Sequence, residues 1–191
     1  MKALFLDRDG TIIIHKPYLH KPEDVELTAN ATDALKHARR LGYALYLFSN
    51  QSGVGRGLFS MEDVHRVNTR MLELLGLGSD LFSGICIAPE HPDAPANYRK
   101  PSPRYILEAI NHDQLAPAQC WMIGDSPSDW QSGISAGINV AAIRSDLMSE
   151  KEEKFAKAHG IHIYNNLMGF CTGLTPGRLK MGVNDQPNAH T

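Results

Sequence analysis

The chain has 191 residues, of which 42% are hydrophobic, and this is enough to build the core of one ordinary globular domain. Its 19 Lys and Arg residues nearly balance 21 Asp and Glu residues, which gives a formal net charge of -2. A chain so close to neutral has no general attraction to nucleic acid or to an anionic membrane. The composition therefore favours a small-molecule partner, and we expect neither nucleic acid nor a membrane to be bound.

The cysteines and the N-terminus indicate a reducing compartment. Cys86, Cys120 and Cys171 are odd in number, and no two of them have C-x-x-C spacing, so we expect reduced cysteines in the core. Residues 1–3 lead directly into an apolar stretch that ends at Asp7, which is too short for the apolar part of a signal peptide. No later run is long enough to span a membrane. These features predict a cytoplasmic protein.

Strands and helices are predicted to alternate along the chain. Short apolar runs bounded by turn residues predict strands at 3–6, 43–48, 85–88, 120–123, 140–143 and 161–164, and helical periodicity predicts helices at 30–41, 60–75, 102–112, 127–137 and 150–158. Ser60, with Asp63 three residues later, is a candidate N-cap for the second of these helices. The alternation is typical of a parallel sheet, so we expect a doubly wound, Rossmann-like α/β fold with helices on both faces.

We expect residues 1–174 to form a single domain with no separate cap domain. Residues 8–29, between the first predicted strand and the first predicted helix, include Pro17 and Pro22 and should form a short flap over the site. Residues 175–191 are polar, unpatterned and rich in turn formers, which predicts a mobile C-terminal tail. We expect the protein to be a monomer.

Polar side chains follow three of the predicted strands directly, in residues 7–11, 49–53 and 124–129, and residues 99–101 (Arg-Lys-Pro) precede the third predicted helix. In an open parallel sheet, ligands bind beyond the carboxyl ends of the strands. Carboxylates gathered there repel one another unless a cation neutralises them, and hard oxygen ligands favour Mg²⁺. Lysine, arginine and hydroxyl groups beside them would hold an anion next to the metal, as phosphoryl transfer requires.

Each of these segments also has an ordinary structural explanation when it is considered alone. An Asp after a strand is more often the cap of a helix or turn, and a Lys-Pro pair is usually part of a loop. Asp129 could simply occupy the first turn of a helix, where an acid suits the helix dipole. Their joint occurrence at strand ends, in one order, indicates a site for a phosphate ester.

These segments resemble the motifs of the haloacid dehalogenase (HAD) superfamily, subfamily III, whose first motif is D-x-D-G-[TV]. Ser49 matches the small hydroxyl of the second motif, Lys100 the lysine of the third, and Asp125 and Asp129 the acids of the fourth. The resemblance covers roughly residues 2–174. It implies a Mg²⁺-dependent phosphomonoesterase that acts through an aspartyl-phosphate.

The resemblance also implies catalytic and metal-binding roles for the matching residues. Asp7 is the nucleophile, Asp9 is the general acid and base, and Lys100 stabilises the charge. Mg²⁺ is held by the carboxylates of Asp7 and Asp125 and by the backbone carbonyl of Asp9. Asp129 holds a metal-bound water or orients Lys100.

Other residues are expected to surround the phosphate. Ser49 and the backbone N–H of Asn50 bind the transferring oxygens, and Thr11 lies behind the metal ligands. Gly10 lets the chain turn sharply beneath the phosphate. The residues expected to select the substrate are Gln51, Ser52, Arg56, Arg99 and His20.

Within the superfamily, the sequence resembles the D-glycero-D-manno-heptose-1,7-bisphosphate phosphatases. The resemblance rests on residues 50–59 (Asn-Gln-Ser-Gly-Val-Gly-Arg-Gly-Leu-Phe), on residues 99–101 and on residues 18–20. It implies a sugar bisphosphate as substrate, with removal of the C7 phosphate. Histidinol-phosphate phosphatases share the N-Q and R-K-P elements, and polynucleotide 3'-phosphatases share fewer details, so both remain alternatives. A sensor that binds a phosphorylated metabolite without turnover would not need a nucleophile beside an acid.

One departure from the group lies just before the Arg-Lys-Pro element. Relatives commonly carry a structural zinc loop of the form C-x-H and then C-x-C, whereas this chain has Ala-Pro-Glu at 88–90 and Ala-Asn-Tyr at 96–98. Glu90 and His91 alone cannot supply the tetrahedral N/S ligands that structural zinc prefers. We therefore expect no structural zinc, His91 as a loop residue, and some other support for the loop.

Overall fold

The computed structural model of the chain describes residues 1–146 and 148–174. Six parallel strands form one sheet in the order β3-β2-β1-β4-β5-β6. The strands are β1 (Lys2–Leu6), β2 (Tyr43–Asn50), β3 (Gly84–Ala88), β4 (Cys120–Gly124), β5 (Asn139–Ile143) and β6 (His162–Tyr164). Each lies at one of the predicted apolar runs, and the strand order confirms the expected doubly wound fold.

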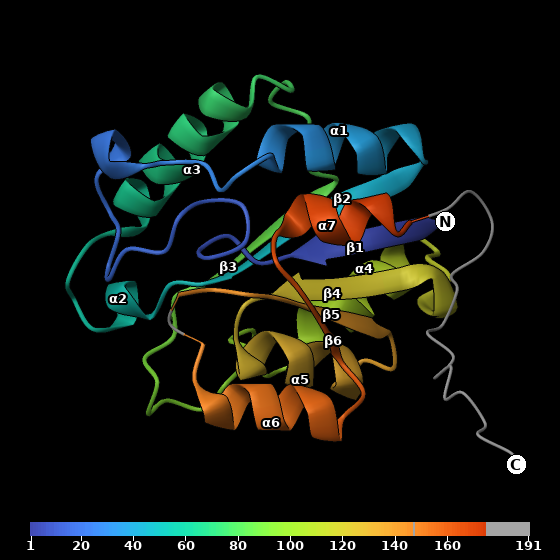
Figure 1. Ribbon diagram of the computed structural model, residues 1–191. Coiled ribbons are helices and arrows are strands. Elements are labelled where there is room, and N and C mark those ends of the chain that lie inside the picture. The colour runs from blue at the N-terminus through green and yellow to red at the C-terminus, as the bar shows by residue number, and fades with distance from the viewer. Residues whose placement is uncertain (147, 175–191) are drawn as a thin grey trace, which may run out of the picture.

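Helices cover both faces of the sheet (Figure 1). On one face lie α1 (Ala31–Arg40), α3 (Met61–Leu75) and α7 (Leu167–Thr172), and on the other lie α4 (Arg104–His112), α5 (Pro127–Ser135) and α6 (Glu150–Ala158). The five longer helices correspond to the five predicted ones. The sequence did not predict α7 or the four-residue α2 (Ser52–Gly55), because such short helices give no clear periodic pattern.

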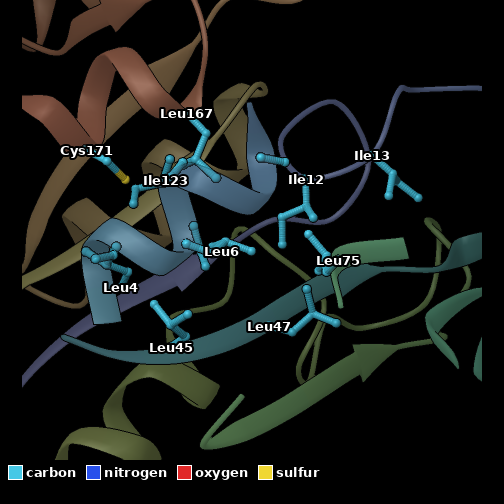
Figure 2. Packing of buried hydrophobic residues seen from close by; sticks show 14 of the residues in the cluster. Leu4, Leu6, Ile12, Ile13, Leu45, Leu47, Leu75, Ile123, Leu167 and Cys171 are labelled. Atoms are coloured by element: carbon cyan, nitrogen blue, oxygen red, sulfur yellow. The ribbon is translucent and has the colours of Figure 1, made fainter. Parts of the chain in front are cut away.

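Strand β1 lies at the centre of the sheet and is buried on both sides. Because side chains alternate across a sheet, Leu4 and Leu6 join the apolar cluster beneath α1, α3 and α7, whereas Phe5 joins the cluster with α4. Figure 2 shows the first cluster, in which the β1 leucines pack with Leu47 of β2 and Ile123 of β4. Burial on both faces explains why the strands read as continuous apolar runs.

Two local predictions from the sequence are confirmed. Cys86, Cys120 and Cys171 are buried free thiols. Ser60 caps α3, because its Oγ accepts from the N–H of Asp63 at 3.2 Å while its own N–H donates to Asp63 Oδ2 at 2.8 Å. These reciprocal bonds satisfy backbone donors at the start of the helix.

The segment between β1 and α1 is anchored at its base. Ile12 and Ile13 are fully buried, and the N–H of Thr28 donates to the Ile12 carbonyl at 2.9 Å. The outer part carries η1 (Pro22–Asp24) and His20, whose ring stacks on Phe59 with centroids 5.6 Å apart. This segment therefore contacts the loop that follows α2, and its role as a flap remains a prediction.

Other expectations concern the extent of the domain and the membrane. The predicted tail at residues 175–191 lies outside the described residues. The limit of the domain at residue 174 therefore stays a prediction. Among the helices of the described segments, none combines the length and the apolar composition needed to cross a bilayer.

Trp130 connects α5 to the end of β4. Its side chain is fully buried, and its Nε1 donates to the carbonyl of Gly124 at 2.9 Å. The ring also packs against Phe155 of α6, with centroids 6.0 Å apart. The hydrogen bond joins the end of β4 to α5, and the acidic residues of the fourth motif lie in the turn between them (Asp125) and in the first turn of α5 (Asp129).

We expect Trp130→Phe to lower the free energy of unfolding by about 1–3 kcal/mol, because the buried Gly124 carbonyl loses this donor. Denaturant unfolding measures the loss. Trp121→Phe is a matched control, since the indole N–H of Trp121 is buried without a hydrogen-bond partner among the described residues. It should cost less, and equal losses would show that the bond to Gly124 contributes nothing.

Candidate active site

Strands β1 and β4 are neighbours at the point where the order of the sheet reverses. The chain builds outward from β1 to β3 on one side, and then returns to place β4 on the other side of β1. The connections leave such neighbouring strands in opposite directions, so a crevice forms beyond their carboxyl ends. Asp7 directly follows β1 and Asp125 directly follows β4, so both acids are carried to this crevice.

Three carboxylates gather there. Asp7, Asp125 and Asp129 each offer an oxygen, and these oxygens lie within 4.8 Å of one another. Asp7 is 7% exposed and Asp129 is 1% exposed, so little water screens their repulsion. The structure thus brings together acids from the ends of the first and fourth strands.

Lys100 lies among these acids and is only 1% exposed. Its Nζ is 2.6 Å from Asp7 Oδ1 and 2.6 Å from Asp129 Oδ1, and it donates to the Phe48 carbonyl at 2.7 Å. Burial lowers the pKa of Lys100, but the carboxylates of Asp129 and Asp7 outweigh burial and raise it above its ordinary value. The lysine is therefore a cation at neutral pH.

One lysine is not enough to keep all of these acids ionised. Burial, followed by the nearby carboxylates of Asp129, Asp125 and Asp9, raises the pKa of Asp7 well above its ordinary value, although Lys100 lowers it. Burial and Asp129 likewise raise the pKa of Asp125 to about 7. Ionisation of the whole cluster at neutral pH therefore requires a further cation.

Asp9 is held beside the cluster by Arg8 and Gln51. The guanidinium of Arg8 donates from Nε to Asp9 Oδ2 at 2.9 Å and from Nη2 to Asp9 Oδ1 at 3.2 Å. Gln51 Nε2 donates to Asp9 Oδ2 at 3.0 Å and to Ser49 Oγ at 2.8 Å. The predicted acid and the predicted phosphate-binding hydroxyl are therefore joined through one amide group.

The charge balance of this group of residues fits a divalent cation. Four aspartates, at positions 7, 9, 125 and 129, face the two cationic side chains of Arg8 and Lys100. Two negative charges therefore remain without compensation. Oxygen is also the ligand that Mg²⁺ prefers, so the donor set suits this ion in both charge and chemistry.

Gly10 and Gly124 leave room for the acids. Gly10 has a φ of +85°, and a Cβ there would lie 2.1 Å from Asp125 Oδ2. A Cβ at Gly124 would lie 2.3 Å from the carboxyl group of Asp129. Only glycine permits both the left-handed backbone at position 10 and the close approach of the carboxylate.

Two side chains hold the loop that carries Lys100. Asn50 Oδ1 accepts from the Lys100 N–H at 2.9 Å, and Asn50 Nδ2 donates to the Lys100 carbonyl at 3.1 Å. Glu90 Oε1 accepts from the N–H groups of Tyr98 at 2.7 Å and Arg99 at 3.3 Å. Glu90 therefore supplies the loop support that the sequence left open. The side chain of Asn50 is therefore engaged with this loop on both sides of the Lys100 peptide group.

Asp129 caps α5 and also forms an ion pair with Lys100. Its Oδ2 accepts from the N–H of Ser126 at 3.0 Å and from Ser126 Oγ at 2.7 Å, and these bonds cap α5. Its Oδ1 forms the ion pair with Lys100. The helix cap thus fixes the carboxylate that pairs with the lysine.

The remaining predicted residues lie outside this hydrogen-bonded group. Ser52 begins α2, and Arg56 is exposed at the end of that helix. His20 Nδ1 lies 2.8 Å from the Tyr18 carbonyl. In the described part of the chain, neither Arg56 nor His20 forms a hydrogen bond or ion pair with the acids or with Lys100. Thr11 is fully buried, and its hydroxyl has no partner among the described residues.

Sequence reasoning missed Arg8 and Asn68. Arg8 Nη1 donates to Asn68 Oδ1 at 2.9 Å, and both side chains are buried. The signal for Asn68 was present, because it is a polar residue within the buried stripe of α3 that includes Val64, Val67 and Met71. A polar side chain in such a stripe requires a buried partner.

We expect Gly10→Ala to weaken Mg²⁺ binding by about 10- to 100-fold, the loss typical when the support of a metal ligand is disturbed. The reason is that the new Cβ would displace the Asp125 carboxylate. Gly57→Ala is the matched control, because Gly57 also has a positive φ, +71°, but nothing lies within 4 Å of its Cβ. Both variants should lose about 1–2 kcal/mol of stability through backbone strain. Calorimetric titration with Mg²⁺ distinguishes them, and unchanged affinity in Gly10→Ala would contradict this account.

Known proteins resemble this chain in sequence. A family model described as "HAD-hyrolase-like" matches residues 97–169. The D-glycero-beta-D-manno-heptose-1,7-bisphosphate 7-phosphatase of Helicobacter pylori is 40% identical over 150 residues, which cover 76% of this chain and 86% of that protein. The D-glycero-D-manno-heptose-1,7-bisphosphate 7-phosphatase of Chlorobaculum tepidum is 32% identical over 193 residues, which cover 93% of this chain and 96% of that protein.

Solved structures share the fold. The D,D-heptose 1,7-bisphosphate phosphatase from B. bronchiseptica, crystallised with magnesium and phosphate, has a TM-score of 0.78 at 22% identity and covers 90% of this chain and 97% of that chain. A putative HAD-like phosphatase from Mesorhizobium loti has a TM-score of 0.67 at 31% identity, over 80% of this chain and 77% of that chain. On the identity and coverage of its relatives, this chain belongs to the D-glycero-D-manno-heptose-1,7-bisphosphate 7-phosphatase family of HAD-like hydrolases.

Proposed function

We propose that this chain is a Mg²⁺-dependent phosphatase that removes the C7 phosphate of D-glycero-D-manno-heptose 1,7-bisphosphate through an aspartyl-phosphate on Asp7. The observation that carries the chemistry is the buried contact of 2.6 Å between Lys100 Nζ and Asp7 Oδ1, within a cluster of three carboxylates. The relatives at 32% and 40% identity support the substrate.

The residues that would hold Mg²⁺ are Asp7 and Asp125, through their carboxylates, and Asp9, through its backbone carbonyl. The bound ion supplies the positive charge that lets the Asp7 carboxylate and a phosphate group lie side by side. The two uncompensated negative charges among the site residues support this assignment. The presence of magnesium and phosphate in the B. bronchiseptica phosphatase supports the same class of site.

Asp7 attacks phosphorus, and Asp9 protonates the sugar oxygen as the P–O bond breaks. Asp9 then takes a proton from the water that hydrolyses the aspartyl-phosphate. Lys100 remains charged throughout and stabilises the negative charge shared by Asp7 and the phosphoryl group. Its two carboxylate contacts and its burial support this role.

Ser49 and the N–H of Asn50 donate to the oxygens of the transferring phosphoryl group. Ser49 Oγ accepts a hydrogen bond from Gln51, which leaves its own hydrogen free for a phosphate oxygen. Gln51 is 5% exposed and also bonds Asp9, which supports a place at the reacting phosphate.

The rest of the substrate is bound by groups further out. Arg56 is exposed, and the buried Nε of Arg99 has no hydrogen-bond partner among the described residues, which supports a role for both cations in binding the second phosphate. Ser52 and His20 complete the set that selects the substrate. The stacking of His20 on Phe59 supports a rigid position for this imidazole.

Phosphate release should have its highest kcat/KM with the heptose 1,7-bisphosphate when that substrate is compared with histidinol phosphate and a 3'-phosphorylated oligonucleotide. A higher kcat/KM for another of these substrates would assign the chain to that activity.

Asp7→Asn should lower kcat by about 10⁴-fold or more, because the amide is a poor nucleophile. Asp33→Asn, an exposed substitution on α1, is the control and should keep full activity. An active Asp7→Asn enzyme would exclude the covalent route.

Mg²⁺ should stabilise the protein more at pH 8 than at pH 5. Without a metal, folding raises the pKa of Asp125 from 3.8 to about 7, so the folded chain holds a proton that the unfolded chain has released. The free energy of unfolding should therefore fall as the pH rises from about 4 to about 7. A bound cation compensates the negative charges of Asp125 and Asp129, so the free energy of unfolding should no longer fall as the pH rises. Thermal melts with and without Mg²⁺ at both pH values test this, and Asp125→Asn should lose most of the difference. An equal gain at the two pH values would contradict the role given to Asp125.

A further inference from the structure

Arg8 is a buried arginine that stands in the sequence between the proposed nucleophile, Asp7, and the proposed acid, Asp9. It is 1% exposed, and all three of its guanidinium nitrogens are engaged in hydrogen bonds. Among the described residues its one ion pair is with Asp9, and it contacts both oxygens of that carboxylate. A planar fork on both oxygens restricts rotation of the carboxylate plane, which a single contact would not do.

Asn68 fixes Arg8 from the opposite side. It is 6% exposed on the core face of α3, and its Oδ1 accepts from Arg8 Nη1 at 2.9 Å. The neighbouring buried positions of α3, Val67 and Met71, are apolar and belong to the main core cluster. Asn68 therefore gives the Arg8 guanidinium a fixed third contact in an otherwise apolar layer. This contact sets the orientation of the guanidinium plane.

The two carboxylate oxygens of Asp9 have different hydrogen-bond partners. Oδ2 accepts from Arg8 Nε at 2.9 Å and from Gln51 Nε2 at 3.0 Å, whereas among the described residues Oδ1 has only the longer contact of 3.2 Å with Arg8 Nη2. The side chain of Asp9 is 18% exposed, so part of it can be reached from the crevice. Oδ1 is thus the oxygen that can face the leaving group while Oδ2 is held.

We propose that Arg8 and Asn68 are positioning residues that fix the carboxyl plane of Asp9 so that Oδ1 points at the oxygen that leaves phosphorus. The inference rests on the proposed function, because it takes Asp9 as the group that delivers the proton. Neither Arg8 nor Asn68 touches the substrate. Both act through the Asn68–Arg8–Asp9 chain of hydrogen bonds.

The test compares substrates whose leaving groups differ in their need for a proton. The sugar bisphosphate has an alkoxide leaving group, whereas p-nitrophenyl phosphate has a leaving group that departs without protonation. Asp9→Asn should lose about 10²- to 10⁴-fold in kcat with the sugar phosphate and much less with the aryl phosphate. Asn68→Leu and Arg8→Lys should show the same selectivity at a smaller scale. We expect losses of about 10- to 100-fold with the sugar phosphate, at nearly constant KM, and little change with the aryl phosphate.

Met71→Ala is the matched control for an indirect effect of stability. Met71 lies one turn from Asn68 on α3 and is fully buried, and no hydrogen bond joins it to the described acid network. Its truncation creates a cavity and destabilises the same helix. It should leave the ratio of the two kcat values unchanged. Thermal melts of all variants relate each kinetic loss to the loss of stability.

The outcomes separate the two proposals. Equal losses of kcat for both substrates in Asn68→Leu and Arg8→Lys, beside a selective loss in Asp9→Asn, would overturn the positioning role and leave the proposed function intact. No selectivity in Asp9→Asn itself would overturn the acid role in the proposed function, and the positioning role with it. If Arg8→Lys does not fold, Asn68→Leu decides the question, because it preserves both charges of the Arg8–Asp9 pair.

Discussion

The ammonium group of Lys100 lies buried between the carboxylates of Asp7 and Asp129, and the rest of the site is arranged around these contacts. Without it the two acids would repel each other in a region that water hardly reaches. In other proteins, removal of one partner of such a buried ion pair lowers the free energy of unfolding by about 3–5 kcal/mol, because the remaining charge has no compensation. The contact joins residues 93 apart in the chain, so it also connects the end of β1 to the loop before α4.

Around this contact, hydrogen bonds hold the charged side chains or the backbone that carries them. Asn50 and Glu90 fix the backbone on either side of Arg99, and the capping bonds at Ser126 fix Asp129. Dipoles and charges that are already oriented need no rearrangement when charge moves during a reaction. Apolar layers cover both faces of the sheet, and the charged residues of the site lie beyond the carboxyl ends of the strands.

The same arrangement links the stability of the protein to its chemistry. Four carboxylates against two cationic side chains leave the metal-free site under electrostatic strain, and burial makes the strain larger. Such local conflicts are expected where function, and not folding, sets the choice of residues. The divalent cation that would relieve the strain is also the one that the proposed phosphoryl transfer requires.

The sequence by itself determined the six strands, the five longer helices and the positions of the acids at the strand ends, because periodicity, turn residues and helix caps act over a few neighbouring residues. Only the tertiary structure decided which polar atoms meet. Asn50 binds the Lys100 backbone and Asn68 binds Arg8, at separations of 50 and 60 residues. Contacts of this kind depend on how loops bend and how helices pack onto the sheet, and no local pattern encodes that geometry. The contact of Glu90 with Tyr98 could not be predicted from the sequence either, although only eight residues separate them. The carboxylate reaches the Tyr98 N–H because the intervening loop folds back on itself.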